Sequence, residues 1–363
     1  SPAAAAITIL DDEALPTVQL AGAALSLGEA DGPAVLTVTL SGPSAAPVTV
    51  DYLSSDGTAL AGDDYTALDG TLTFAPGETE LLITLNLTDD LVYEGDEAFT
   101  ITITNPTGAA LGSPAAAAIT ILDDEALPTV QLAAPALYTG EDDGPAALVF
   151  TLSGPSTSPI TVSYATANGT ALAGDDYTAV NGTLTFTPGE TQKFILVNFV
   201  DDIIYEENET FTFTISNPVN AALGSPIQTV LTINDNEALP TVQLAGAALS
   251  LGEADGPAML TVTLSGPSAA PVTVSYATAN GTALAGDDYT AIDGMLTFAP
   301  GETQKVIAIA LVNDTLVESD ETFTLTLSSP TGAALCSPSQ AVLTILDDDE
   351  QIMYWKFLPI LFR

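Results

Sequence analysis

Acidic residues recur in this sequence at a fixed interval, in groups that are typical of metal sites and of carboxylate-based hydrolysis. The interval is 112 residues, and it separates Asp11, Asp123, Asp235 and Asp347, each of which follows a short apolar segment. The chain is therefore a tandem repeat. Each repeat therefore carries the same acids at the same spacing and should support the same chemistry.

The composition limits the partners that such acids can have. The 363 residues include 47 acids, four bases and no histidine, for a net charge of -43. A chain of this charge repels nucleic acid and anionic membrane surfaces, so we expect its partners to be cations or basic surfaces. Hydrophobic residues make up 47% of the chain, which predicts folded domains rather than acidic disorder. No apolar run is long enough to predict a membrane span.

Short segments in which apolar and polar residues alternate predict β-strands with one buried face. Seven strands in about 110 residues is the size of an immunoglobulin-like β-sandwich. We therefore expect an all-β chain, a tandem array of three immunoglobulin-like seven-stranded β-sandwiches joined end to end by very short linkers. In the first repeat the predicted strands are 17–20, 36–40, 48–52, 71–74, 81–87, 99–104 and 117–122.

The predicted topology gathers the acids at one pole of each sandwich. If successive strands are antiparallel, the first, third and fifth connecting loops share one pole with the exit of the last strand. Two unit charges about 4 Å apart repel by roughly 4 kcal/mol at an effective dielectric of 20, so the cluster predicts a counter-cation. Hard oxygen ligands on irregular loops, without histidine or thiolate, favour Ca²⁺ over zinc, copper and Mg²⁺. In the first repeat these acids are Glu29, Asp63, Asp64, Asp89, Asp90, Glu94, Asp123 and Asp124.

The order of motifs in each repeat resembles the Calx-beta domain, which occurs in sodium–calcium exchangers, in an integrin β subunit and in very large bacterial surface proteins. In the first repeat these motifs are GEADG from residue 28, GTALAGDDY from 57, LTFAPGET from 72, DDLVYEGDEAF from 89 and TNPTGAALGSPAAAAITILDD from 104. All three full repeats match along their length. The resemblance implies a calcium-binding β-sandwich.

The resemblance also implies calcium ligands in each repeat. In the first repeat they are Glu29, Asp64, Asp89, Asp90, Glu94, Asp123 and Asp124. In the second they are Glu141, Asp176, Asp201, Asp202, Glu206 and Asp235. In the third they are Glu253, Asp288, Asp314, Glu318, Asp347, Asp348 and Asp349.

Two amides depart from this ligand pattern. Asn236 replaces the final acid of the second repeat, and one charge fewer predicts fewer or weaker ions there. Asn313 replaces the first aspartate of a pair in the third repeat. Because an amide oxygen still coordinates calcium, this substitution predicts a weakened site rather than a lost one.

These residues also allow other interpretations than a calcium site. The acids could be solvated loop residues, although their convergence from four segments argues against this. Paired carboxylates also run glycoside hydrolysis, but the acids recur in every repeat and no histidine is present for a triad, so we expect no enzyme. The Asn-X-Thr motifs, such as the one at Asn168, fit turn chemistry better than glycosylation, since Asp-Gly-Thr replaces them in the first repeat. Cys336 replaces a glycine and has no cysteine to pair with.

We expect five segments along the chain. Residues 1–13 repeat 113–125 letter for letter and form an orphan last strand, cut from a longer array or donated to another molecule's sheet. The three Calx-beta repeats are 14–125, 126–237 and 238–350. Residues 351–363 form an apolar, cationic tail. A surplus strand and a tail of this kind predict head-to-tail self-association.

Together these features predict a non-enzymatic structural protein. We expect a bacterial, exported, extracellular or cell-surface rod that calcium stiffens, as the subunit of a filament or stalk. The short linkers Glu-Ala-Leu before Pro128 and Pro240 favour rigid joints. A calcium-dependent adhesin or calcium-sensing module is the alternative, but the near-identity of residues 15–50 and 239–274, which differ at one position, favours the structural role.

Overall fold

The alternating segments of the first repeat form β-strands in the computed structural model, which describes residues 13–349. All seven predicted strands are present, and two short strands, β2 and β8, are added to them. The elements of the first repeat are β1 (Thr17–Leu20), β2 (Ala24–Gly28), the 3-10 helix η1 (Glu29–Asp31), β3 (Ala34–Leu40), β4 (Val48–Ser55), β5 (Asp69–Phe74), β6 (Glu80–Leu85), β7 (Glu97–Thr107), β8 (Ala110–Leu111) and β9 (Ala116–Leu122).

The second and third repeats form the same elements in the same order. In the second they are β10 (Thr129–Leu132), β11 (Ala136–Gly140), η2 (Glu141–Asp143), β12 (Ala146–Leu152), β13 (Ile160–Asn168), β14 (Asn181–Phe186), β15 (Gln192–Val197), β16 (Glu209–Val219), β17 (Ala222–Leu223) and β18 (Gln228–Asn234). In the third they are β19 (Thr241–Leu244), β20 (Ala248–Gly252), η3 (Glu253–Asp255), β21 (Ala258–Leu264), β22 (Val272–Asn280), β23 (Asp293–Phe298), β24 (Gln304–Ile309), β25 (Glu321–Thr331), β26 (Ala334–Leu335) and β27 (Gln340–Leu346).

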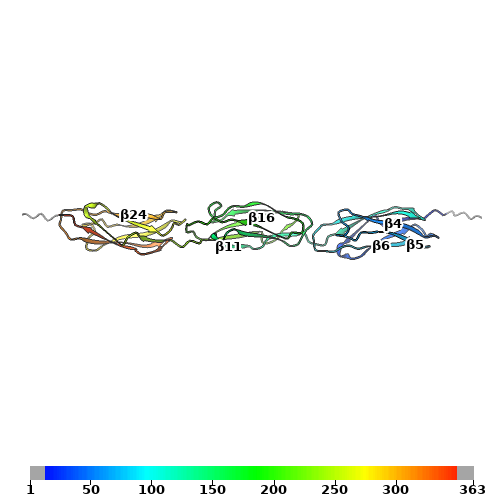
Figure 1. Ribbon diagram of the computed structural model, residues 1–363, viewed down its shortest axis with the longest axis horizontal. Helices are drawn as coiled ribbons and strands as arrows, with labels where there is room; N and C mark the ends of the chain where they lie inside the picture. The colour runs from blue at the N-terminus through cyan, green and yellow to red at the C-terminus, as the bar shows by residue number, and fades with distance from the viewer. Residues whose placement is uncertain (1–12, 350–363) are drawn as a thin grey trace, which may run out of the picture.

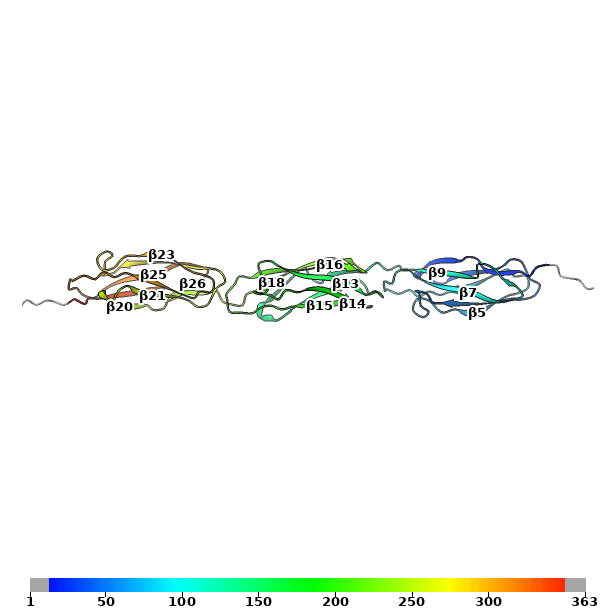
Figure 2. The ribbon, with the colours of Figure 1, turned by 90° about the horizontal axis from the view of Figure 1, so that it is seen from above.

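Each repeat is a sandwich of a four-stranded and a five-stranded sheet. In the first repeat the strand orders are β6-β3-β1-β8 and β2-β9-β7-β4-β5. The added strand β2 lies in the other sheet from β1, because β1 pairs antiparallel with β3 and β2 pairs parallel with β9. The three sandwiches follow one another in a single row, visible in two perpendicular views (Figures 1 and 2).

The core of each sandwich includes an aromatic stack close to the acidic pole. Tyr65 and Phe99 are each 2% exposed. Their rings stack with centroids 3.8 Å apart and an interplanar angle of 8°. The same pair recurs as Tyr177 with Phe211 and as Tyr289 with Phe323. Because Tyr65 directly follows Asp64, the stack anchors the acidic third loop to the core.

Neighbouring sandwiches are joined by a backbone contact as well as by the linker. The Tyr93 N–H donates to the Pro155 carbonyl oxygen and the Thr157 N–H donates to the Tyr93 carbonyl oxygen, both at 3.2 Å. Tyr205 forms the same isolated bridge with the third repeat. Ser156, between the two partners of Tyr93, is 3% exposed. The fifth loop of one repeat therefore docks on the second loop of the next.

Replacing Phe99 by alanine should destabilise the first repeat by about 3–5 kcal/mol, because the substitution removes a buried ring and leaves Tyr65 without its stacking partner. Chemical denaturation followed by tyrosine fluorescence would measure the loss. Leu82→Ala is the control, since Leu82 is 52% exposed on the outer face of the four-stranded sheet. A loss of the same size in both variants would contradict the assigned core.

Replacing Thr157 by proline should loosen the first joint, because proline has no N–H to donate to Tyr93. Small-angle X-ray scattering should report a shorter mean maximum dimension for this variant. Thr157→Ala is the matched control, since Ala269 occupies the same place in the second joint and donates the same bond to Tyr205. Unchanged scattering from the proline variant would mean that the linker alone sets the geometry.

Candidate metal site

The first loop of each repeat places one glutamate at the acidic pole, inside the fold. A turn of 3-10 helix, η1, follows β2 and is closed by the Gly28 N–H, which donates to Asp31 Oδ2 at 2.7 Å. Gly32 ends the turn at a φ of 73°, which favours glycine. This short helix holds Glu29 with its side chain only 6% exposed. Glu29 Oε1 has no hydrogen-bond partner among the described residues.

The third loop is folded by its own polar side chains. Asp64 Oδ2 accepts a 2.6 Å hydrogen bond from the Leu60 N–H, and Asp56 Oδ1 accepts bonds from the Tyr65 hydroxyl and the Ala61 N–H. Asn168 and Asn280 replace Asp56 in the other repeats and accept the same tyrosine hydroxyl bond. These amides are structural, as the turn interpretation of their Asn-Gly-Thr motifs predicts. They fix the position of the aspartate before the tyrosine.

The fifth loop is tied to the third by its backbone. The Thr88 N–H donates to the Asp64 carbonyl oxygen at 2.9 Å. Asp90 Oδ1 then accepts the Val92 N–H at 2.7 Å, and the same two-residue turn recurs at Asp202 and Asp314. Further along, the Glu94 N–H donates to Asp123 Oδ1 at 3.3 Å, which joins the fifth loop to the exit of β9.

These four segments bring the acids of the first repeat together in three groups, each with carboxylate oxygens within 4.8 Å of one another. The helix triad contains Glu29, Asp89 and Asp124. The exit triad contains Glu29, Asp123 and Glu125. The loop triad contains Asp64, Glu94 and Glu97. The convergence predicted from antiparallel topology is thus present in the structure, while the role of these residues as calcium ligands stays a prediction.

The second repeat keeps the exit triad as Glu141, Asp235 and Glu237, and the loop triad as Asp176, Glu206 and Glu209. Its helix triad differs, because Asn236 Nδ2 donates to Asp201 Oδ1 at 3.1 Å. Asp202 lies near enough to Glu141 to repel its charge.

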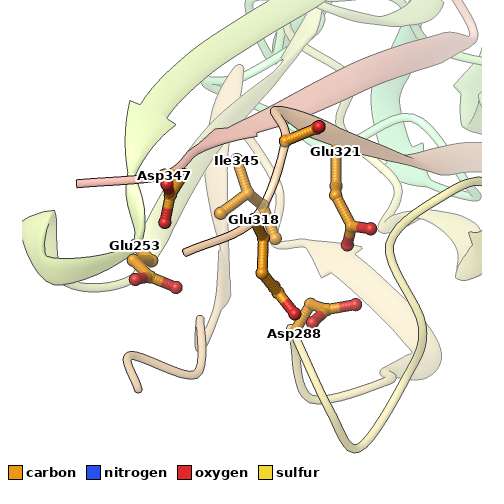
Figure 3. A pocket seen from close by; sticks show the side chains of 7 residues that line it. Glu253, Asp288, Glu318, Glu321, Ile345 and Asp347 are labelled. Carbon is orange, nitrogen blue, oxygen red and sulfur yellow. The ribbon is translucent and has the colours of Figure 1, made fainter. Parts of the chain in front are cut away.

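In the third repeat a small pocket is lined by predicted ligands from all four segments (Figure 3): Glu253, Asp288, Glu318 and Asp347, together with Glu321. The negative charges of Asp314, Asp348 and Asp349 also act on Glu253. Asn313 is exposed in the fifth loop. The third pole therefore assembles the same set of acids as the first, with an amide at one position.

Two sets of acids at the poles were missed from the sequence. Glu97, Glu209 and Glu321 begin the strand after the fifth loop and complete the loop triads or line the pole. They recur at the repeat interval, three residues after a predicted ligand, and this signal could have revealed them. Glu125 and Glu237 are the equivalents of the predicted Asp349, so aligning the repeats would have found them.

Burial and crowding raise the pKa values of these carboxyl groups. Burial, followed by the charges of Asp349 and Asp314, raises the pKa of Glu253 to about 7. Burial, followed by Asp64 and Asp90, raises the pKa of Glu94 to about 7. Burial, followed by the neighbouring carboxyl groups of Glu125 and Glu237, raises the pKa values of Glu29 and Glu141 to about 8. Without a cation, the fold therefore favours the protonated form of these carboxyl groups.

The donor set fits a calcium ion. Within residues 13–349 the two lysines form ion pairs with Glu190 and Glu302. Neither lysine therefore offsets the negative charge of the acids at a pole. Each unpartnered oxygen would lose hydration without gaining a donor, and a cation would supply the missing partner. The buried side-chain oxygens without a partner among the described residues are Glu29 Oε1, Glu125 Oε2, Glu141 Oε1, Asp235 Oδ1, Glu237 Oε2, Glu253 Oε1 and Asp349 Oδ2.

The structure and its poles define an array of acidic β-sandwich domains. The family model of the Calx-beta domain matches residues 11–125, 123–237 and 235–349, and the chain belongs to this family. The resemblance drawn from the motifs is therefore confirmed. No helix within residues 13–349 is long and apolar enough to cross a membrane.

Several known proteins are similar to this chain. Extracellular matrix protein 3 of Lytechinus variegatus is 31% identical over 73% of this chain, and FRAS1-related extracellular matrix protein 2 of Homo sapiens is 30% identical over 74%. The chain spans 9% of the length of each. Sodium/calcium exchanger 1 of Bos taurus is 34% identical over 47% of this chain and 20% of its own length. The crystal structure of calcium binding domain CBD12 of CALX1.1 is 28% identical over 58% of this chain and 82% of that one, with a TM-score of 0.30.

Without calcium, the unfolding free energy should fall as the pH rises from 5 to 8. Carboxyl groups whose pKa is raised from 4.5 in the unfolded chain to about 7 in the fold bind protons in the folded state across this range, so protonation favours folding at the lower pH. Melting temperatures in chelator at several pH values test this, with saturating calcium as the comparison, where the dependence should flatten. A melting temperature in chelator that rises with pH would contradict the assigned crowding.

Proposed function

We propose that the chain is a non-enzymatic, extracellular calcium-binding rod, with ions bound at the acidic pole of each sandwich. The observation that carries this proposal is the buried glutamate of the first loop: Glu29, Glu141 and Glu253 are at most 9% exposed, and each has a buried Oε1 without a partner among the described residues. A buried carboxylate without a donor is stable only if it is protonated or bound to a cation.

Membership of the Calx-beta family supports the calcium assignment, and the extracellular matrix relatives support an extracellular location. The bacterial source and export expected from the sequence stay predictions. The role as a filament or stalk subunit and the alternative role as an adhesin or calcium-sensing module also stay predictions. The ends assigned to head-to-tail self-association lie outside the described residues, apart from Glu13.

Calcium should stiffen the rod, because the fifth loop, which would hold the ion, also forms the backbone contact with the next repeat. Tyr93, which bridges to the second repeat, directly follows Val92 and precedes Glu94 of the loop triad. An ion held by Asp64, Glu94 and Glu97 would fix the backbone that docks on Pro155 and Thr157.

The calcium assignment is tested by thermal unfolding of the full chain in chelator and in excess calcium. A ligand at about 100 times its dissociation constant adds about 2.7 kcal/mol per site, so calcium should raise the melting temperature by several degrees. Replacing Asp64, Asp176 and Asp288 together by asparagine should reduce this rise. The same variant should be more stable than the natural chain in chelator, because each asparagine keeps the hydrogen bond to the loop and removes a repelling charge.

Asp69→Asn combined with Asp293→Asn is the matched control. Both aspartates are exposed, and Asn181 already occupies their position in the second repeat. The control should keep the full calcium response. An equal response in the triple variant and the control, or no response in the natural chain, would refute the assigned sites.

A further inference from the structure

We infer that the calcium capacity differs between the repeats: the second repeat binds one ion fewer than the first, because the Asn236 amide satisfies Asp201 in place of an ion. This inference rests on the proposed function and adds the occupancy of each repeat to it. It concerns the position shared by Asp124, Asn236 and Asp348, which are spaced at the repeat interval.

The first repeat has carboxylates at three positions where the second has two carboxylates and an amide. Its helix triad joins Glu29, Asp89 and Asp124, all carboxylates, with oxygens within 4.8 Å. Like charges at this spacing repel, so a cation is the partner that suits all three. Glu29, whose buried Oε1 has no partner among the described residues, belongs to this triad and to the exit triad.

In the second repeat Asn236 satisfies Asp201 without an ion, while Glu141 keeps an oxygen that has no partner among the described residues. Asn236 Nδ2 donates to Asp201 Oδ1 at 3.1 Å, so an N–H group occupies the position from which a carboxylate would coordinate. Calcium in proteins is bound by oxygen atoms. For an ion to bind there, the amide must break this hydrogen bond and turn its oxygen inward, and the triad would still supply one negative charge fewer than in the first repeat.

The remaining acids of the second repeat keep their capacity. Its loop triad and its exit triad consist of carboxylates, and Glu141 Oε1 is unpartnered as Glu29 Oε1 is. The effect of Asn236 is therefore local, and the second repeat should still bind calcium. In the third repeat Asp348 is retained. The amide there is Asn313, an exposed residue at the position that Asp89 and Asp201 occupy in the other repeats.

The test is the number of calcium ions bound by the full chain at saturation, measured by equilibrium dialysis with radiolabelled calcium. Asn236→Asp should bind one more ion per chain than the natural protein, and the reciprocal variant Asp124→Asn should bind one fewer. Asn181→Asp is the matched control: it makes the same change of charge on an exposed strand residue of the same repeat, where the other repeats carry Asp69 and Asp293. It should leave the number unchanged.

Each result separates this inference from the function on which it rests. If the natural chain binds calcium but Asn236→Asp binds no more than the Asn181→Asp control, the inference is wrong and the proposed function stands. If no chain binds calcium, the proposed function itself fails. Circular dichroism verifies that each variant is folded, and Asp124→Asn provides an independent loss of one ion in a different repeat.

Discussion

The repulsion among carboxylates that the fold holds together is the constraint on which the rest of this structure depends. Each sandwich delivers acids from four segments to one pole, and the backbone bonds of the loops, such as that between Thr88 and Asp64, keep them there. The chain supplies no described lysine or arginine to the poles. Because the loops cannot spread without breaking these bonds, the charges must be neutralised by protons or by a cation.

This arrangement connects the candidate metal site with the contact between neighbouring repeats. The fifth loop contributes Asp89, Asp90 and Glu94 to the pole, and its Tyr93 also forms the backbone bridge to the next repeat. In the third repeat the equivalent residue, Val317, is 46% exposed rather than bridged within the described chain. The loop that would hold an ion is thus the loop that contacts the next repeat, so the proposed ion would couple occupancy to stiffness.

Much of this could be predicted from the sequence because the repeats and the alternation are strong signals. The seven strands, the shared pole and most of its acids followed from periodicity and from antiparallel order. The strands β2 and β8 could not be predicted, because they pair in parallel, β2 with β9 and β8 with β1, and the antiparallel order assumed for the sequence contains no such pairs. The contact between repeats through Tyr93 could not be predicted either, because its hydrogen bonds are made by the backbone and do not depend on residue type.

The differences between repeats show where residue type alone is insufficient. The substitution at Asn236 predicted a weaker site from its lost charge, but the hydrogen bond to Asp201 became visible only in the structure. An amide that replaces a carboxylate differs in two ways: it removes a charge, and it offers a donor that satisfies the remaining acid. The second effect depends on the position of a neighbour that lies 35 residues away in the sequence.

The account is tested most directly by a crystal structure of the chain grown with calcium, with anomalous scattering used to locate the ions. We expect peaks beside the buried oxygen of Glu29 and between Asp64, Glu94 and Glu97 in the first repeat. A well-ordered pole with no peak, in which waters alone contact these carboxylates, would contradict the claim that the clustered charges are neutralised by a bound cation.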